Sequence, residues 1–577
     1  MDNKLNLLGE RSTNNLELLG VITANKLLLN MIAPVDYSNS LIVTSRGDGS
    51  GISQMRLNVS GTLTLTLDGN ARFYTDAAAT LGESTTTVFT TGVNVIYIRN
   101  SSGTSNLKFS DKRLLLGAGS VTGPGSGSGM WNPEPAGGDM SKMPTITCNN
   151  WDFPNCSQIA WFYGSMVLYT GNISIFIGMR KLTINGTGTI TDTLSSIPAN
   201  ATIIGINMTS NLISGNVNTL PATLEQLNIG AGNTVSGDLA GFSTSLWYIN
   251  ISGNNTVSGD VKDFKEVITI NIAGLNTITG DISTLDPSVR SFSLGGYNTV
   301  FGDISTFKTG VNDIYLGGNA STYGDIAYLP STLTQLVVQS SNTITGDIST
   351  FKHGMIAVQI YGSNTLYGKV DDIHSTLQQF AIGGYNTIDG SINNIPSSIN
   401  SIQVHGYNTV GGDVSTLRVP YTTIAGNNII FGDINYLSSS LVQVDIRGNN
   451  TISGSMGANL LNKTSITNFN IWGNNTISGD LANLPSNAVT IQLVGLSTVN
   501  TYTSGRVWTS NLYYFMFVPV SPGGLDSTEV DNLFIDMANT CISGGSIYVT
   551  GTNAAPTAAS AAARATLISR GYSISIN

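Results

Sequence analysis

The sequence predicts a mainly β protein whose central part is a solenoid, a stack of short coils of about 22 residues each. One observation behind this prediction is an asparagine that returns at nearly constant spacing. Another is the motif that follows the asparagine. It consists of Thr, a β-branched residue, any residue and Gly, and Asp often comes next. Apolar columns on both sides of the asparagine complete the pattern. The asparagines are Asn211, Asn233, Asn255, Asn276, Asn298, Asn342, Asn364, Asn386, Asn408, Asn428, Asn450 and Asn475.

Each coil is expected to begin with a short strand. In the coil of Asn255, the apolar residues Ile249 and Ile251 flank a polar residue, and the other coils repeat this alternation. A period of two indicates a strand with one buried face. Two more apolar columns follow the asparagine, here Val257 and Val261, so each coil supplies about four or five inward side chains.

A single coil cannot fold alone. Burying about five apolar side chains contributes roughly 1.5–3 kcal/mol each, whereas ordering the backbone costs roughly 1–2 kcal/mol per residue. Stacking lets each coil cover the apolar edges of its neighbours. One asparagine per coil then forms a ladder, with its side-chain amide bonded to the backbone of the turn after each strand. We expect this ladder at Asn233, Asn255, Asn276, Asn298, Asn342, Asn364, Asn386, Asn408, Asn428, Asn450 and Asn475.

The repeated text, for example LEQLNIGAGNTVSGDL from Leu224 to Leu239, resembles a leucine-rich repeat whose turn ends in L-x-G-x-I. The asparagine falls one position later than in the common L-x-x-L-x-L-x-x-N spacing, so a parallel β-helix remains the alternative architecture. The resemblance covers roughly residues 180–500. It implies a fold and leaves the function open.

The amino-acid sequence outside the repeats predicts further structural elements. Short Leu-rich clusters open the chain, and alternating strands follow, with the best hairpin signal at Asp68-Gly69. Near the C-terminus, Asp526-Ser-Thr-Glu529 is a capping box that predicts a helix to about Ala538. An Ala-rich helix is expected from about Thr557 to Arg570.

These signals divide the chain into six expected parts. They are a docking segment at 1–40, a small antiparallel β domain at 41–120, a Gly/Ser linker at 121–129, an aromatic N-terminal cap at 130–180, the leucine-rich-repeat-like solenoid at 181–504 and an α/β C-terminal cap at 505–577. The aromatic cap is expected because the apolar end of the first coil must be covered.

Composition excludes several classes of protein. The 577 residues contain 25 Lys and Arg against 35 Asp and Glu, a formal net charge of −10, so no basic stripe is available to neutralise nucleic-acid phosphates. The opening MDNKLNLLGERS lacks the basic and apolar regions of a secretory signal, and no stretch approaches the roughly 18 apolar residues of a membrane span. Without a signal, Cys148, Cys156 and Cys541 are expected to be free buried thiols, although Cys148 and Cys156 are close enough in sequence for a disulfide loop.

Aromatic residues recur at two positions that should face solvent. One position precedes the asparagine and the other lies three residues after it. Flat rings among outward amides are typical of a carbohydrate-binding surface, although these rings also have the option of packing over neighbouring coils. The candidate ligand-binding residues are Tyr297, Phe301, Tyr323, Tyr367, Tyr385, Tyr407 and Phe431.

The Gly-Asp step places carboxylates in a column that could hold calcium, but bonds from each carboxylate to backbone amides of its own turn are the favoured interpretation. The column comprises Asp238, Asp260, Asp281, Asp303, Asp325, Asp347, Asp413, Asp433 and Asp480. No other metal site and no cofactor are predicted.

Catalysis is poorly supported by the sequence. The three histidines, His353, His374 and His405, do not share a column in the repeat, and no metal-ligand spacing, nucleophile elbow or phosphate loop appears. A carboxylate pair for glycoside hydrolysis cannot be singled out among so many Asp residues. The protein is therefore expected not to be an enzyme.

The plan of docking segment, small β domain, linker and long solenoid resembles a virion appendage of a tailed bacteriophage. The closing text GSIYVTGTNAAPTAASAAARATLISRGYSISIN is similar to the C-terminal ends of leucine-rich-repeat phage fibre and surface proteins. The resemblance implies a structural, adhesive head or tail fibre, a homotrimer on the virion exterior that is assembled in the host cytoplasm. Its partners would be capsid or tail proteins at residues 1–117 and host-surface or mucus glycans along the solenoid. A glycan-degrading tail spike and a bacterial surface adhesin remain alternatives.

Overall fold

The chain forms two compact units, Met1–Thr234 and Val235–Asn577. The computed structural model describes residues 18–23, 26–31, 41–44, 52–75, 79–110, 115–118, 131–133, 145–147, 158–161, 168–171, 173, 180–208 and 211–577. Most of the second unit consists of repeated coils, as the sequence predicts, and most of the first does not.

The first unit begins with small antiparallel sheets. Strands β1 (Leu18–Thr23) and β2 (Lys26–Met31) pair as a hairpin. A five-stranded sheet has the order β12 (Thr145–Thr147), β3 (Leu41–Thr44), β9 (Thr104–Phe109), β5 (Leu63–Leu67) and β7 (Thr86–Phe89). Strand β8 (Gly92–Asn100) pairs antiparallel with both β4 (Ile52–Val59) and β6 (Ala71–Tyr74). The predicted small antiparallel region is therefore confirmed.

The hairpin predicted at Asp68-Gly69 is wrong. The turn does connect β5 to β6, but β5 pairs with β7 and β9 whereas β6 pairs with β8. The Asp68 carboxylate accepts hydrogen bonds from the backbone and side-chain amides of Asn106, at 2.6 and 2.9 Å. These bonds fasten the turn to β9 and hold the pKa of Asp68 below its usual value. Asp-Gly is thus used to pass from one sheet to another.

Parallel pairing starts within the first unit. Strand β10 (Leu115–Ala118) pairs antiparallel with β4 and parallel with β13 (Gln158–Trp161), which pairs parallel with β15 (Lys181–Thr193). Strands β11 (Trp131–Pro133), β14 (Leu168–Gly171), β16 (Ile203–Met208), β17 (Leu212–Asn216) and the first part of β18 (Gln226–Asp238) complete this unit, with 3₁₀ helices η4 (Leu194–Ser196) and η5 (Val217–Thr219). The 121–129 linker, Trp151, Phe153, Cys148 and Cys156 lie outside the described residues.

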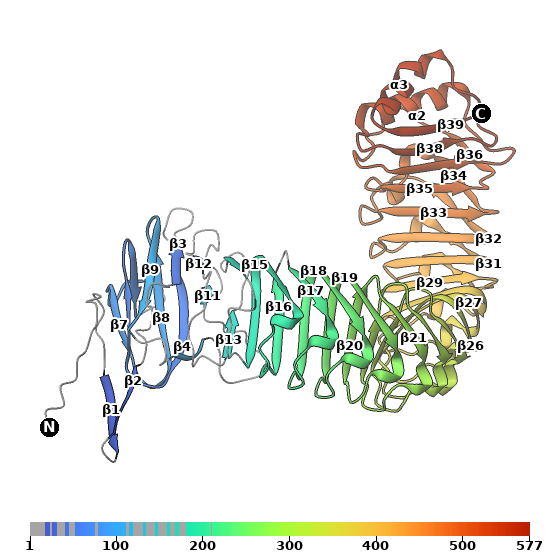
Figure 1. Ribbon diagram of the computed structural model, residues 1–577. Coiled ribbons are helices and arrows are strands. Elements are labelled where there is room, and N and C mark those ends of the chain that lie inside the picture. The colour runs from blue at the N-terminus through green and yellow to red at the C-terminus, as the bar shows by residue number, and fades with distance from the viewer. Residues whose placement is uncertain are drawn as a thin grey trace, which may run out of the picture. The chain divides into compact units, whose positions relative to one another are not determined.

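In the second unit, each coil has three sides. In the first complete coil, β19 (Tyr248–Asp260) runs along one side, turns at Asn255 and continues along a second side. The 3₁₀ helix η7 (Val261–Asp263) and a connecting segment form the third side. Tyr248 pairs in register with Thr269 of the next coil, so the coils add parallel strands one after another (Figure 1).

Later coils repeat this plan. Their strands are β20 (Thr269–Gly274), β21 (Thr277–Asp281), β22 (Ser291–Leu294), β23 (Thr299–Asp303), β24 (Asp313–Leu316), β25 (Ser321–Asp325), β26 (Gln335–Asp347), β27 (Ala357–Lys369), β28 (Gln379–Asp389), β29 (Ser401–Gly406), β30 (Gly411–Asp413), β31 (Tyr421–Asp433), β32 (Gln443–Met456), β33 (Asn468–Gly473), β34 (Thr476–Asp480), β35 (Thr490–Val494) and β36 (Thr498–Thr501). The 3₁₀ helices are η6 (Leu239–Gly241), η8 (Ile282–Thr284), η9 (Ile304–Thr306), η10 (Ile326–Tyr328), η11 (Ile348–Thr350), η12 (Val370–Asp372), η13 (Ile392–Asn394), η14 (Val414–Thr416), η15 (Ile434–Tyr436) and η16 (Leu481–Asn483).

The predicted apolar columns form the core of these coils. Ile249, Ile251, Val257 and Val261 are all fully buried, and the matching residues of the other coils are buried as well. The arrangement of a parallel strand, a turn and a short helical segment is that of a leucine-rich-repeat-like solenoid. The sequence prediction of the fold class is thereby confirmed.

The repeated asparagines are fully or almost fully buried and link one coil to the next. Asn450 accepts a hydrogen bond from the backbone amide of Ile430 in the preceding coil, at 3.1 Å, and donates to the carbonyl of Trp472 in the following coil, at 3.1 Å. Both partners are backbone groups at the turn after the first strand of a neighbouring coil. The side chain lies between coils, where backbone groups of two neighbours lie within reach on either side. Ala320 occupies this position in one coil, so no side-chain amide is available there.

The Gly-Asp step has a steric explanation. Gly454 has φ +107°, and a Cβ added to it would lie 2.0 Å from Oδ1 of Asp433 in the preceding coil. That carboxylate in turn accepts a bond from the backbone amide of Asn435, at 2.8 Å, and caps η15. Glycine is therefore needed both for its backbone conformation and for the space that the neighbouring aspartate occupies.

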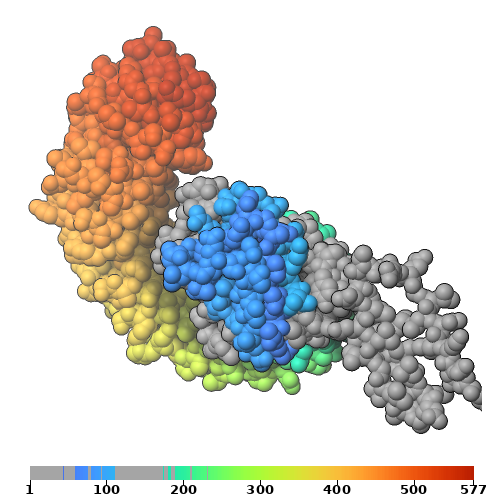
Figure 2. Space-filling model, turned by 90° about the vertical axis from the view of Figure 1, so that its left-hand side faces the viewer, coloured from blue at the N-terminus to red at the C-terminus, as the bar shows by residue number. Residues whose placement is uncertain are grey.

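The C-terminal part continues the same parallel sheet. Strands β37 (Tyr514–Val518), β38 (Gly545–Val549) and β39 (Tyr572–Ile576) follow β35, and they alternate with α2 (Ser527–Thr540) and α3 (Ala561–Ser569) (Figure 1). The predicted capping box at Asp526 and Glu529 is confirmed at the start of α2. In Figure 2 the yellow to red coils form one continuous surface that leads into this region.

Candidate functional site

The seven aromatic residues singled out in the sequence lie on the surface. Each is between 46% and 60% exposed. They are Tyr297, Phe301, Tyr323, Tyr367, Tyr385, Tyr407 and Phe431. The aromatic rings therefore remain available to solvent, although packing over neighbouring coils was the other interpretation.

Two of these rings are stacked. The ring centroids of Tyr385 and Tyr407 are 6.1 Å apart and their planes differ by 16°. Both residues directly precede a ladder asparagine, and the turns of adjacent coils bring them together. Ile429 and Phe431 of the next coil are also exposed. Three consecutive coils thus carry exposed apolar side chains, before the asparagine in two of them and after it in the third.

The sequence analysis did not select three other exposed tyrosines. Tyr328 and Tyr436 end 3₁₀ helices and are 71% and 70% exposed, and Tyr513 is 65% exposed. These positions are not part of either aromatic column. Their side chains are at least as exposed as those of the seven aromatic residues, but they lie elsewhere on the repeat.

The aspartate column is occupied by backbone hydrogen bonds. Each carboxylate accepts from the amide two residues further along, as Asp303 does from Ser305 at 2.8 Å. The same bond is made by Asp238, Asp260, Asp281, Asp325, Asp347, Asp413, Asp433 and Asp480. In the described part of the chain, no three His, Cys, Asp or Glu side chains form a group that could hold a metal ion.

Two of the three histidines lie next to each other. His353 and His374 lie on neighbouring coils, with ring centroids 3.7 Å apart. His353 is in a turn and His374 is in a connecting segment, and they occupy different positions of the repeat, 11 residues after Asn342 and 10 residues after Asn364. Both segments belong to the third side of the coil, and the spacing of the repeat places them next to each other. His405 is elsewhere, at the end of β29.

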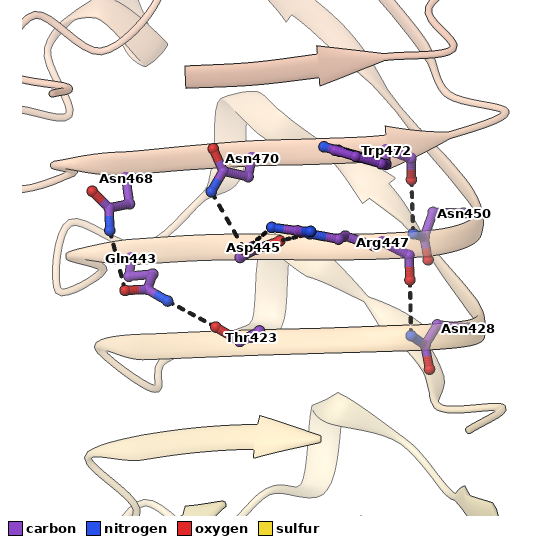
Figure 3. A network of polar contacts seen from close by, with 9 residues as sticks. All are labelled: Thr423, Asn428, Gln443, Asp445, Arg447, Asn450, Asn468, Asn470 and Trp472. Carbon is purple, nitrogen blue, oxygen red and sulfur yellow. Dashed lines mark hydrogen bonds and ion pairs between the residues drawn. The ribbon is translucent and has the colours of Figure 1, made fainter. Parts of the chain in front are cut away.

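A polar network covers the outward face of β31, β32 and β33 (Figure 3). Arg447 donates to Asp445 through Nε and Nη2, at 2.7 and 2.8 Å, and its guanidinium lies 4.8 Å from the ring centroid of Trp472. The side-chain amide of Asn470 donates to Oδ2 of Asp445, at 3.4 Å, the same oxygen that accepts from Nη2 of Arg447. The carboxylate raises the pKa of Arg447, so this guanidinium is charged and held in place.

The network extends to both sides. Gln443 donates to the hydroxyl of Thr423, at 2.7 Å, and accepts from Asn468, at 3.2 Å. Two coils before Arg447, burial lowers the pKa of His405, although Asp445 acts in the opposite direction. Arg and Trp side chains fixed on a sheet surface are the residue types that dominate binding energies at interfaces.

A signal for this network was present in the sequence. Arg447 and Trp472 occupy the position directly after the second apolar column, and so do His405 and Tyr361. In most other coils this position holds Gly, Ala or Ser. Aligning the coils would have shown large polar and aromatic residues gathering at one end of that column. The ion pair with Asp445 was not predictable from spacing alone.

Among the described residues, no helix is both long and apolar enough to span a bilayer. Cys541 is a free thiol buried in the C-terminal part. Burial raises its pKa to about 11. The thiol therefore lacks the thiolate character that a reactive cysteine needs.

The comparisons with known proteins reveal likeness of structure alone. No family model and no curated protein matches the sequence. A plant peptide hormone receptor, RGFR1 in complex with RGF2, is 17% identical over 74% of this chain and 76% of its own, with a TM-score of 0.44. PEPR1 bound to AtPEP1 is 13% identical over 71% and 81%, with a TM-score of 0.35. An internalin from Listeria monocytogenes is 17% identical over 68% and 86%, with a TM-score of 0.24.

The coordinates thus define the class of protein: a leucine-rich-repeat-like parallel β solenoid with small antiparallel sheets in its first unit. Solenoids of this kind are typically non-enzymatic binding scaffolds, because stacked coils present long, regular surfaces.

Proposed function

We propose that this chain is a non-enzymatic adhesive protein of a phage virion, a head or tail fibre that binds host-surface or mucus glycans through its solenoid. The observation that carries the proposal is the exposed aromatic set on the second unit, above all the stacked pair Tyr385 and Tyr407. Flat aromatic rings contact the apolar faces of sugars, and neighbouring amides bond their hydroxyls. The virion assignment rests on the resemblance of the chain's plan and of its closing text.

The arrangement of the aromatic residues suits weak, repeated contact. The rings occur on several coils, and neighbouring coils are separated by about 4.8 Å, the usual distance between adjacent strands. A single exposed ring contributes little binding energy. Several rings that engage one polysaccharide act at a high effective concentration, so that the overall affinity exceeds that of any one site. An oligomer, proposed to be a trimer, would multiply this effect.

The test replaces Tyr297, Tyr385 and Tyr407 by Ala together and measures retention on a column of immobilised mucin. We expect retention to fall by at least about tenfold, because the loss of several linked contacts is multiplied. The matched control replaces Tyr328, Tyr436 and Tyr513 by Ala. It removes the same number of exposed tyrosines from positions outside the aromatic columns and should leave retention unchanged.

Equal retention by the two triple variants would contradict glycan binding by this column. Release of new reducing ends from host polysaccharide incubated with the wild type would instead favour the glycan-degrading tail spike.

To test the virion assignment, purified particles are labelled with antibody against the solenoid and viewed by electron microscopy. Label on the particle exterior is expected, and its absence would contradict this part of the proposal.

A further inference from the structure

A groove in the second unit lies where the repeat is interrupted. It has a volume of about 570 Å³, within the range of small-ligand sites. It is open to solvent and is lined on one side by the α1 coil and η16 and on the other by the segment after β36. The lining residues are Leu461, Asn462, Asp480, Ala482, Asn483, Ser486, Thr503, Ser504, Gly505, Arg506 and Val507.

Both walls of the groove depart from the standard coil. Helix α1 (Ala458–Leu461) stands where other coils have a 3₁₀ helix, and residues 502–513 form a longer connection between β36 and β37. Regular coils need neither feature to stack. Insertions into repeats map to loops on one face, and that face is often where a ligand binds. The groove thus occurs where the chain departs from what stacking alone requires.

The second wall is held rigidly by buried polar groups. Asp536 on α2 accepts hydrogen bonds from the backbone amides of Gly505, at 2.6 Å, and Arg506, at 3.1 Å, and from the hydroxyl of Tyr502, at 2.8 Å. The Tyr502 hydroxyl also accepts from the indole of Trp508, at 3.2 Å. These bonds fix four residues between 502 and 508 in the connection, so the groove is formed before any ligand arrives.

Arg506 ties the two walls together. Its guanidinium donates to the carbonyls of Ala482, Leu484 and Pro485 and lies 3.9 Å from the ring centroid of Trp508. Burial lowers its pKa to about 10, so the group is still charged at neutral pH. No carboxylate lies within ion-pair distance of this guanidinium in the fully described C-terminal part, and its buried Nε has no partner.

The groove surface favours a ligand with many hydroxyl groups. Asn462, Asn483, Ser486, Thr503 and Ser504 offer amides and hydroxyls, which donate and accept hydrogen bonds equally well. Asp480 lines the groove on the opposite side from Arg506, and its carboxylate is held by the backbone amide of Thr503, at 3.0 Å. The Arg506 guanidinium is buried and bonded to carbonyl groups, so the lining offers no accessible cation to an anionic ligand, and the few apolar side chains give little preference for a lipid.

We propose that this groove binds one uncharged sugar unit, a hexose or an N-acetylhexosamine, and that it is a second carbohydrate site separate from the aromatic columns. The ring hydroxyls would bond Asp480 and the amides of Asn462 and Asn483. Arg506 is a positioning residue, because it fastens the walls through carbonyl groups. This inference does not depend on the aromatic column, since the two sites share no residue.

The test uses the full chain with the aromatic column already removed by Tyr297, Tyr385 and Tyr407→Ala, so that only the groove is probed. Saturation-transfer NMR is recorded with a mixture of galactose, glucose, mannose, N-acetylglucosamine, N-acetylgalactosamine and glucuronic acid at millimolar concentration. Adding Ser486→Trp fills the groove, and we expect the sugar signal to fall at least fivefold. The matched control Ser439→Trp changes an exposed serine at the corresponding place two coils earlier and should leave the signal unchanged.

Thr503→Trp, from the facing wall, provides a second blocking variant, and circular dichroism checks that each protein is folded. The proposal is overturned if the triple-Ala protein transfers no saturation to any sugar, if a folded blocked variant gives the same signal as the control, or if glucuronic acid alone responds. Each of these results concerns the groove and leaves the mucin test of the aromatic column independent.

Discussion

The asparagine ladder provides the sharpest test of how the coils are held together. The perturbation is Asn450→Ala, and the comparison is Asn449→Ala at the adjacent residue. Asn450 is fully buried and bonds the backbone of the coils before and after it, whereas Asn449 is exposed. The two variants differ by one position in sequence and remove the same atoms. Their difference therefore isolates the effect of the buried amide.

The cost follows from the two partners that Asn450 leaves behind. The amide of Ile430 and the carbonyl of Trp472 would be buried without a hydrogen bond in Asn450→Ala. Each unpaired group costs about 1–3 kcal/mol, so the two together destabilise the structure by about 2–6 kcal/mol. An exposed substitution such as Asn449→Ala changes the free energy of unfolding by less than about 0.5 kcal/mol.

Native-state hydrogen exchange measures this locally, which is appropriate for a long chain that does not unfold in one step. The amide of Ile430 is the reporter, because its acceptor is the deleted side chain. A loss of about 2 kcal/mol corresponds to roughly thirtyfold faster exchange. The reasoning is refuted if Ile430 exchanges at the same rate in Asn450→Ala and Asn449→Ala.

The other predictions concern single positions. Ser340 has φ +119° at a place where the neighbouring coils have glycine. Ser340→Gly should therefore raise the free energy of unfolding by about 1 kcal/mol, whereas the control Ser341→Gly should not raise it. Urea denaturation followed by fluorescence measures the free energy of unfolding of both variants. The lowered pKa of His405 means that the unfolded chain takes up its proton more readily. The stability due to neutral His405 is thus present above its unfolded pKa of about 6.5 and is lost as the pH falls through the lower folded value. His405→Gln should therefore lose less stability than the wild type between about pH 7.5 and pH 5, and identical losses would argue against this assignment. Cys541, with a pKa raised to about 11, should resist iodoacetamide at pH 8 in the folded protein and react after denaturation, as read by mass spectrometry of its peptide. Rapid labelling of the folded chain would contradict its burial.

The sequence predicted those features that each coil repeats. The apolar columns, the asparagine position and the Gly-Asp step each recur at a fixed distance within one coil, so periodicity was sufficient to place Val257 inside and Tyr407 outside. The capping box at Asp526 was equally local, since an N-cap interacts only with the first turn of its own helix. The hairpin at Asp68-Gly69 was predicted wrongly because a turn signal does not specify which strands will pair.

What the sequence by itself determined, then, is the architecture: a coil that cannot bury its apolar residues alone must stack, and the spacing of the residues sets the size of the coil. Only the tertiary structure decided which groups meet across coils, such as the side chains of Arg447 and Trp472, those of His353 and His374, and the Asp536 carboxylate with the backbone amide of Gly505. The physical reason is that residues some 20 to 30 positions apart become neighbours only when the register between coils is fixed. That register depends on how all the coils pack together, whereas the repeat is recognised from sequence spacing without any packing.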